Sequence, residues 1–445
     1  MTDQDRSIDF LVRPGGALHG RFRVPGDKSI SHRAVMLGAL ADGTTEVSGF
    51  LEGDDALATL AAIRQLGVTV EGPRHGRLRI EGVGLHGLQP ADGPLDLGNS
   101  GTSMRLLAGL LAAQPFDSIL TGDASLRRRP MRRVTEPLAQ MGARIETGPE
   151  GTAPLHIRGG QALQGIRYTM PVASAQVKSA LLLAGLYAEG ETWVQEPAPT
   201  RDHTERMLEG FGYPVERTGN WCGVGGDGSL QGGEIDVPAD ISSAAFFIVG
   251  ASIATGSDVV LEHVGINPTR TGVIDILGHM GADIEIRNRR EVGGEPVGDV
   301  RVQARPLHGL TIPERLVPLG IDEFPALFVA AACAHGTTLL RGAAELRVKE
   351  SDRIAVMAEG LQAVGIHAEP RDDGILIRGG RIRGGAVDSH GDHRIAMAFA
   401  MAGLCSGAEI TVRDCRNVDT SFPGFVDLAR EAGLDLSVLA AGESR

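Results

Sequence analysis

The pattern of hydrophobic and polar positions repeats six times along the chain. In each repeat a segment with helical periodicity, such as "DDALATLAAIRQLG", ends at a glycine, and a strand-like stretch such as "VTVE" follows. A glycine directly after the last periodic residue is typical of the C′ position of a helix. Six matches at such even spacing indicate a repeated structural unit. The six glycines, 68 to 84 residues apart, are Gly67, Gly142, Gly212, Gly281, Gly365 and Gly433.

A second landmark, a polar cluster that opens an apolar helix, lies 38 to 43 residues before each glycine. The clusters are "GDKSISHR", "GNSGTSMR", "ASAQVKSA", "PADISSAA", "IDEFPALF" and "GDHRIAMA". The helices are apolar nearly all round, so we expect them to be buried. A turn and a strand follow each of them, so the unit reads β-α-β-α-β-β. We expect an α/β protein of six such repeats, three in each of two domains, divided near residue 238.

The polar clusters have two interpretations. Their Ser, Asp and Asn side chains are good helix N-caps, and each cluster alone needs no other role. Helix N-termini also attract anions, through free N–H groups and the helix dipole. Cationic residues occur at several of these places, and they favour anion binding over capping alone: Lys28, Arg33, Arg105, Lys178 and Arg394.

Composition limits the class of ligand. The 445 residues carry a net charge of −13, which argues against broad contact with nucleic acid or with an anionic membrane. A local cluster of Arg and Lys still permits an anionic small molecule. The four cysteines form no CxxC motif, no apolar run reaches 18 residues, and no apolar segment begins the chain. We therefore expect a cytoplasmic protein with incidental thiols.

Other motifs are weaker or ambiguous. "GVGGDG" matches GxGxxG but no apolar helix follows it, and "HGDH" lacks the further His or Cys that would complete a metal site. The arginines of "LRRRPM" fit either a solvated run or a site. In "ELRVKESDRI", Lys349 and Arg353 would share one face of a surface helix, with Glu350 beside them. Asp322 in "IDEFP" fits a helix cap or a base.

Together, nine stretches resemble the 5-enolpyruvylshikimate-3-phosphate synthase family. They are "PGDKSISHR", "LGNSGTSMR", "RRRPM", "ASAQVKSA", "TRDHTE", "NPTRTG", "DEFP", "RVKESDR" and "GDHRIAM". The resemblance implies two domains, each an inside-out α/β barrel of three repeats. It also implies that residues 1–23 join residues 238–445 in the C-terminal domain, that residues 24–237 form the N-terminal domain, and that the active site lies in the cleft between them.

The implied reaction moves the enolpyruvyl group of phosphoenolpyruvate to the 5-hydroxyl of shikimate 3-phosphate and releases phosphate. The resemblance assigns shikimate 3-phosphate to Lys28, Ser29, Arg33, Ser174, Gln176, Arg201, Asp322 and Lys349. It assigns phosphoenolpyruvate to Lys28, Gly101, Arg129, Gln176, Arg353 and Arg394. Bidentate Arg pairing suits such oxyanions. Gly101 would leave the space beside phosphoenolpyruvate that the inhibitor glyphosate uses in the family.

The catalytic residues implied are Asp322, Glu350 and Lys28. Asp322 would take the hydroxyl proton and Glu350 would protonate the methylene carbon of phosphoenolpyruvate. No metal or organic cofactor is implied, and we expect a monomer that binds neither nucleic acid nor membrane. The chain departs from some members at Thr420 and Ala175, where they have Lys and a second Ser.

Two alternatives remain at this point. The sister enzyme, UDP-N-acetylglucosamine enolpyruvyl transferase, shares the six-repeat architecture, but its usual acid is a Cys near "GDASLRRRP", where this chain offers only Asp123. A non-catalytic binder of an anionic polymer such as RNA is the other. The net charge, the 4% aromatic content and the carboxylates among the arginines argue against it.

Overall fold

The computed structural model describes residues 8–440, which form two compact units. The first unit contains residues 8–25, 239–290 and 296–440, and the second contains residues 26–238 and 291–295. Each unit has its own hydrophobic core. None of the described helices is long and apolar enough to cross a bilayer.

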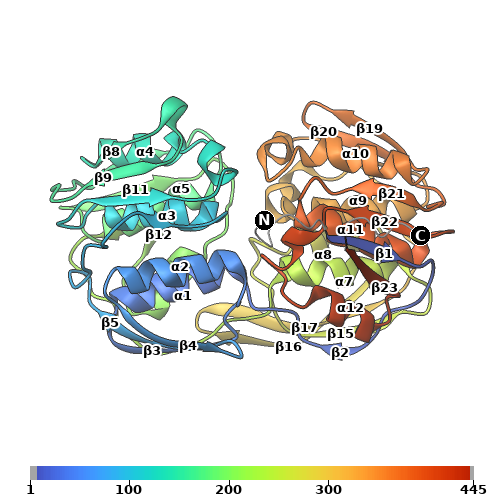
Figure 1. Ribbon diagram of the computed structural model, residues 1–445, viewed down its shortest axis with the longest axis horizontal. Coiled ribbons are helices and arrows are strands. Elements are labelled where there is room, and N and C mark those ends of the chain that lie inside the picture. The colour runs from blue at the N-terminus through green and yellow to red at the C-terminus, as the bar shows by residue number, and fades with distance from the viewer. Residues whose placement is uncertain (1–7, 441–445) are drawn as a thin grey trace. The chain divides into compact units, whose positions relative to one another are not determined.

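The second unit holds the first three repeats (Figure 1). Their elements are β14 (Glu234–Asp236), α1 (Lys28–Leu40), β3 (Asp42–Ser48), α2 (Asp54–Gln65), β4 (Thr69–Arg74) and β5 (Arg77–Val83) in the first repeat. The second comprises β6 (Leu95–Asp96), α3 (Gly101–Leu111), β7 (Ser118–Thr121), α4 (Arg132–Gln140), β8 (Arg144–Glu146) and β9 (Leu155–Arg158). The third comprises β10 (Arg167–Thr169), α5 (Ala175–Gly185), β11 (Glu191–Gln195), α6 (His203–Gly210), β12 (Glu216–Thr218) and β13 (Trp221–Gly225).

The first unit holds the other three repeats. The fourth comprises β2 (His19–Phe22), α7 (Ile241–Ile253), β15 (Asp258–Gly265), α8 (Gly272–His279), β16 (Asp283–Val292) and β17 (Glu295–Gln303). The fifth comprises α9 (Phe324–Cys333), β18 (Thr337–Leu340), α10 (Arg353–Ala363), β19 (His367–Arg371) and β20 (Gly374–Arg378). The sixth comprises β21 (Gly385–Asp388), α11 (His393–Ala402), β22 (Ile410–Arg413), α12 (Phe425–Ala432), β23 (Leu436–Ala440) and β1 (Ile8–Val12). Short 3-10 turns join some of these elements: η2 (Leu126–Arg128), η3 (Pro149–Gly151), η4 (Glu314–Leu316), η5 (Pro318–Gly320), η6 (Ala344–Val348), η7 (Gly403–Cys405) and η8 (Arg416–Val418).

One strand order recurs in the sheets. In the third repeat the order is β10-β11-β13-β12, with β10 parallel to β11 and with β13 antiparallel to both of its neighbours. The fifth repeat has three strands in its sheet, and two parallel bridges, His308 to His335 and Thr311 to Leu339, stand in the place of the first strand. Three sheets take a strand from far along the chain: β14 joins β3, β2 joins β15, and β1 lies between β22 and β23.

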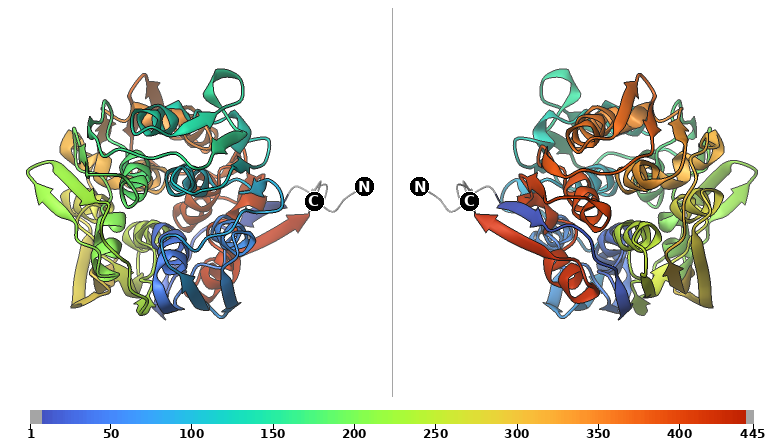
Figure 2. Two further views of the ribbon diagram at one scale, coloured as in Figure 1. Left: turned by 90° about the vertical axis from the view of Figure 1, so that its left-hand side faces the viewer. Right: turned by 90° about the vertical axis from the view of Figure 1, so that its right-hand side faces the viewer.

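The first helix of each repeat is the buried one. Nearly every residue of α1, α3, α5, α7, α9 and α11 is shielded from solvent. Figure 2 shows helices gathered inside each unit with strands around them, which is the inside-out arrangement. The second helix of each repeat ends at the predicted glycine, and all six glycines have φ between 81° and 117°. A side chain is strained in that left-handed conformation, so glycine ends each helix. The predicted six-repeat α/β fold is confirmed.

Candidate active site

In the second unit, the N-terminal turns of α1, α3 and α5 lie together. Gln176 on α5 donates from Nε2 to Thr102 Oγ1 on α3 at 3.1 Å, and Arg33 on α1 donates from Nη2 to Ser179 Oγ on α5 at 2.8 Å. Asp27, Ser100 and Ser174 cap the three helices, each accepting a backbone N–H of the first turn. Three neighbouring N-termini concentrate the positive ends of three helix dipoles. The polar clusters of α1, α3 and α5 therefore do cap their helices, and this role leaves room for anion binding at the same helix ends.

The first cluster, at α1, places its two cations differently. Lys28 is partly exposed, and its Nζ lies 3.0 Å from Asp55 Oδ2. Arg33 is buried, donating from Nε to Thr204 Oγ1 at 2.6 Å and from Nη1 to the Ser29 carbonyl at 2.8 Å. Burial lowers the pKa of Arg33 to about 10, so the side chain remains a cation at neutral pH. Lys28 is thus presented at the helix end, whereas Arg33 braces α1 against its neighbours.

Gly101 opens α3 between two arginines. Arg105 donates from Nη1 to Gln176 Oε1 at 2.6 Å, and Arg129 donates from Nη2 to Asn99 Oδ1. A Cβ atom placed on Gly101 would lie 2.9 Å from Arg105 Nη1 and 3.1 Å from Arg129 Nη1. Both distances are shorter than ordinary van der Waals contact. The absence of a side chain at this position therefore lets two guanidinium groups approach the helix N-terminus.

The third cluster contains a buried ion triad. Lys178 on α5 is fully buried, with Nζ 2.7 Å from Glu205 Oε1 and 2.9 Å from Glu196 Oε1. Burial opposes the charge of Lys178, but the two carboxylates outweigh that effect and raise its pKa. Arg201, half-buried in the loop before α6, lies close enough to help lower the pKa of Arg33. Lys178 therefore contributes to structure, and Arg201 lies nearer to solvent.

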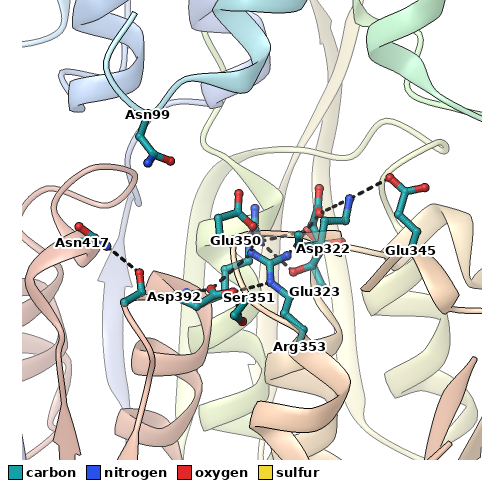
Figure 3. Close-up of polar contacts among 12 residues, drawn as sticks. Asn99, Asp322, Glu323, Glu345, Glu350, Ser351, Arg353, Asp392 and Asn417 are labelled. Carbon is teal, nitrogen blue, oxygen red and sulfur yellow. Dashed lines mark hydrogen bonds and ion pairs between the residues drawn. The ribbon is translucent and has the colours of Figure 1, made fainter. Parts of the chain in front are cut away.

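In the first unit, Arg353 at the start of α10 gathers three carboxylates (Figure 3). Its Nε lies 2.8 Å from Asp392 Oδ2, its Nη2 2.6 Å from Glu350 Oε2, and its Nη1 3.6 Å from Asp322 Oδ1. Arg353 is 1% exposed and Asp392 is fully buried. Burial opposes both charges, but their mutual attraction outweighs it, which raises the pKa of Arg353 and lowers that of Asp392.

Asp322 and Glu350, unlike Asp392, remain partly exposed. Their side chains retain 16% and 32% exposure, which leaves both carboxylates accessible to a ligand. Lys349 Nζ lies 3.4 Å from Asp322 Oδ1 and 3.3 Å from Glu345 Oε1. Arg394 on α11 donates from Nη1 to the Asp322 carbonyl at 3.0 Å. Two partly exposed carboxylates thus lie beside three cations, Lys349, Arg353 and Arg394.

Three sequence interpretations change. Lys349 and Arg353 do not share a helix, because η6 ends at Val348, Lys349 is extended and α10 begins at Arg353. The surface ion-pair helix is therefore wrong. Asp322 is not the N-cap of α9, because Glu323 occupies that position. The Glu323 side chain accepts no hydrogen bond from the backbone of the helix. Of the arginine run, only Arg129 is held by a side chain, and its two predecessors are exposed.

The motifs did not indicate several buried hydrogen bonds that link the first helices of the repeats to neighbouring helices. His32 accepts or donates at Nδ1 with Thr59 Oγ1 at 2.7 Å, and Thr59 lies 2.5 Å from Ser103 Oγ, which links α1, α2 and α3. Burial lowers the pKa of His32 to about 3, so it is neutral. Ser242 and Glu323 form a similar link between α7 and α9. Location within the polar clusters could have indicated His32, Ser103, Ser242 and Glu323, but Thr59 lies outside the clusters and carried no such signal. Among residues 8–440, no group of three or more His, Cys, Asp or Glu side chains is arranged to hold a metal ion.

Comparison with known proteins identifies the fold and then the family. An enolpyruvyl transferase structure, NikO from Streptomyces tendae, superposes with a TM-score of 0.79 over 98% of this chain and all of that one, at 17% identity. That likeness defines the fold alone. EPSP synthase from Acinetobacter baumannii superposes with a TM-score of 0.89 at 59% identity, over 97% of this chain and all of that one.

The sequence comparisons agree with that structure. The 3-phosphoshikimate 1-carboxyvinyltransferase of Alkalilimnicola ehrlichii is 70% identical, covering 97% of each chain, and that of Methylococcus capsulatus is 68% identical, covering 98% of this chain and 99% of that one. The family model described as EPSP synthase (3-phosphoshikimate 1-carboxyvinyltransferase) matches residues 12–428. The chain belongs to the EPSP synthase family, and the resemblance read from its motifs is confirmed.

Proposed function

We propose that this chain transfers the enolpyruvyl group of phosphoenolpyruvate to the 5-hydroxyl of shikimate 3-phosphate and releases inorganic phosphate. One observation carries the proposal: Asp322 and Glu350, both accessible, lie on the same buried arginine and beside Lys349. A reaction that moves two protons between anionic substrates needs an acid, a base and cations in one place. The family assignment supports this activity over the sister transferase and over a polymer binder.

We assign substrate contacts in both units to the same pair of substrates. In the second unit these are Lys28, Ser29, Arg33, Gly101, Arg129, Ser174, Gln176 and Arg201. In the first unit they are Asp322, Lys349, Arg353 and Arg394. The helix N-termini and guanidinium groups at these positions suit phosphate and carboxylate oxygens. Arg33 acts mainly through α1, because its donors already engage Thr204, Ser179 and the Ser29 carbonyl.

Asp322 acts as the general base. Lys349 Nζ and Arg353 Nη1 face its Oδ1 at 3.4 and 3.6 Å and stabilise its negative charge, so the carboxylate is ready to accept a proton. The 5-hydroxyl oxygen attacks C2 of phosphoenolpyruvate as its proton passes to Asp322. General base catalysis of this kind contributes about 10²–10⁴-fold.

Glu350 acts as the acid in the same step. The phosphate and carboxylate of bound phosphoenolpyruvate place like charge beside it, which favours its protonated form. Its proton goes to the methylene carbon C3, which becomes a methyl group in a tetrahedral intermediate. A methyl proton then returns to Glu350, the C2–O bond to phosphate breaks, and the enol ether re-forms. Asp322 passes the hydroxyl proton to the departing phosphate, so both carboxyl groups return to their starting state. Lys28 and Arg394 stabilise the leaving phosphate.

Deuterium incorporation tests the proposal. In D₂O, the enol ether product formed from phosphoenolpyruvate and shikimate 3-phosphate should carry deuterium in its vinyl methylene group, because C3 passes through a methyl stage. Product should form only when both substrates are present. Mass spectrometry and proton NMR of the product measure both. Product without vinyl deuterium would contradict the protonation at C3, and no product would contradict the reaction.

The same proposal includes the state and location of the enzyme. One chain carries every residue of the proposed site, which supports a monomer, and sedimentation velocity would test it. All four cysteines are free, which supports a reducing compartment such as the cytoplasm.

A further inference from the structure

A buried polar chain in the first unit leads from Arg270 to Arg394. Arg270 Nη2 lies 3.0 Å from Asp240 Oδ1 and donates to Ser242 Oγ at 2.7 Å. Ser242 Oγ donates to Glu323 Oε1, and the same oxygen lies 3.7 Å from Arg394 Nη1. Arg270 lies in the "NPTRTG" loop, Ser242 on α7 and Glu323 at the start of α9. These polar contacts therefore link three segments to Arg394 on α11.

Burying these charged and polar side chains lowers the stability of the fold unless each of them has a partner. Arg270 and Ser242 are each 3% exposed, and Glu323 is 2% exposed. A buried carboxylate without compensating partners is strongly destabilising. Capping does not account for Glu323, since its side chain accepts no N–H from α9. Instead, Glu323 Oε1 accepts the hydrogen bond of Ser242 and forms an ion pair with Arg394.

We propose that Glu323 is a positioning residue that fixes the guanidinium of Arg394 for phosphoenolpyruvate, and that Ser242 and Arg270 act through Glu323. The inference rests on the proposed function, in which Arg394 contacts phosphoenolpyruvate. Arg394 Nη1 donates a hydrogen bond to the Asp322 carbonyl at 3.0 Å and forms a longer ion pair with Glu323 Oε1 at 3.7 Å. A guanidinium whose plane is already fixed loses less conformational freedom when it pairs with an oxyanion.

The direction in which Glu323→Gln changes the affinity for phosphoenolpyruvate distinguishes a positioning role from a purely electrostatic one. Glu323→Gln removes a negative charge near a site for an anion, and on Coulombic grounds alone phosphoenolpyruvate should bind more tightly. If Glu323 positions Arg394, the same substitution loosens the guanidinium and phosphoenolpyruvate should bind more weakly. The two accounts therefore predict opposite changes in one quantity.

The experiment compares full-length variants by steady-state phosphate release. For Glu323→Gln we expect the KM for phosphoenolpyruvate to rise about tenfold, with kcat and the KM for shikimate 3-phosphate each changed less than about threefold. Ser242→Ala keeps both charges and should raise the same KM about threefold. In the Glu323→Gln background, Ser242→Ala should add almost nothing, because it acts through Glu323.

Ser252→Ala is the matched control. Ser252 is a fully buried serine on the same helix, and its Oγ donates to the Ile248 carbonyl at 2.7 Å, far along α7 from Ser242. Its kinetics should equal those of wild type. If Glu323→Gln does not fold, Ser242→Ala with this control supplies the test.

Failure of the inference and failure of the function are distinguishable. Active wild type together with an unchanged or lowered KM for phosphoenolpyruvate in Glu323→Gln would overturn the positioning role alone. Equal effects of Ser242→Ala and Ser252→Ala would overturn the relay through Ser242. Wild type without turnover would overturn the proposed function and this inference with it.

Discussion

Replacing Gly101 with alanine tests the geometry of the helix end at α3. The added Cβ would lie 2.9 Å from Arg105 Nη1 and 3.1 Å from Arg129 Nη1, so each guanidinium must retreat by a few tenths of an ångström. Both contacts are with the ends of flexible side chains, so the helix itself can stay in place. The cost should therefore fall on the arrangement of the two cations rather than on the fold.

The magnitude follows from that displacement. A misplacement of about 1 Å in a catalytic arrangement can cost about 10²-fold, so roughly half of that shift should lower kcat/KM for phosphoenolpyruvate about 10- to 30-fold. That loss corresponds to about 1.4–2 kcal/mol of transition-state stabilisation. Stability should change by less than about 1 kcal/mol, because alanine in a helix gains about 0.5–1 kcal/mol over glycine and the close contacts offset part of the gain.

The assay is phosphate release at varied phosphoenolpyruvate, with denaturant unfolding of the same protein. Gly278→Ala is the matched control, because Gly278 also lies within a helix but no heavy atom would lie within 4 Å of its Cβ. The control should keep wild-type kinetics. If kcat/KM of Gly101→Ala stayed within twofold of wild type, the argument that Gly101 admits the guanidinium groups would be refuted.

Three further predictions concern individual side chains. Asp322→Asn keeps the shape of the side chain but removes the base, so kcat should fall about 10²–10⁴-fold in the same assay, and a fall below tenfold would exclude Asp322 as the base. Asp392→Asn leaves Arg353 buried without its one fully buried carboxylate partner and should cost about 3–5 kcal/mol in denaturant unfolding, whereas a loss under about 1 kcal/mol would contradict the pairing. The folded-state pKa of His32 is lowered from 6.5 to about 3, so the unfolded chain takes up the proton first and stability falls with pH below 6.5. On that account wild type should lose about 2 kcal/mol between pH 6.5 and pH 5 relative to His32→Asn, and parallel pH profiles of the two proteins would contradict it.

The sequence predicted what depends on local pattern. Each helix that ends at a repeat glycine was predictable, because the left-handed position after the helix requires a residue without Cβ. The burial of α7 and α9 was predictable as well, because their sequences are apolar on every face. The buried arginines Arg33 and Arg353 were recognisable as parts of motifs, but the sequence did not indicate which residues they contact.

The sequence did not predict what depends on distant pairing. β14 pairs with β3, in which Glu46, the partner of Glu234, lies 188 residues earlier, and no periodicity signals such a partner. Lys349 and Arg353 have helical spacing, yet the chain is extended at Lys349. Two of the three acidic partners of Arg353, Asp322 and Asp392, lie on other elements, where local spacing does not reveal them. The link from Ser242 to Glu323 spans 81 residues and is equally invisible to a pattern search.

The most direct test of the central claim is phosphate release from phosphoenolpyruvate, measured in parallel with shikimate 3-phosphate and with UDP-N-acetylglucosamine. The account predicts phosphate release only with shikimate 3-phosphate, and its loss in Asp322→Asn. Release only with the nucleotide sugar would contradict the proposed acceptor while leaving the fold intact, and it would make Asp123 the acid to test.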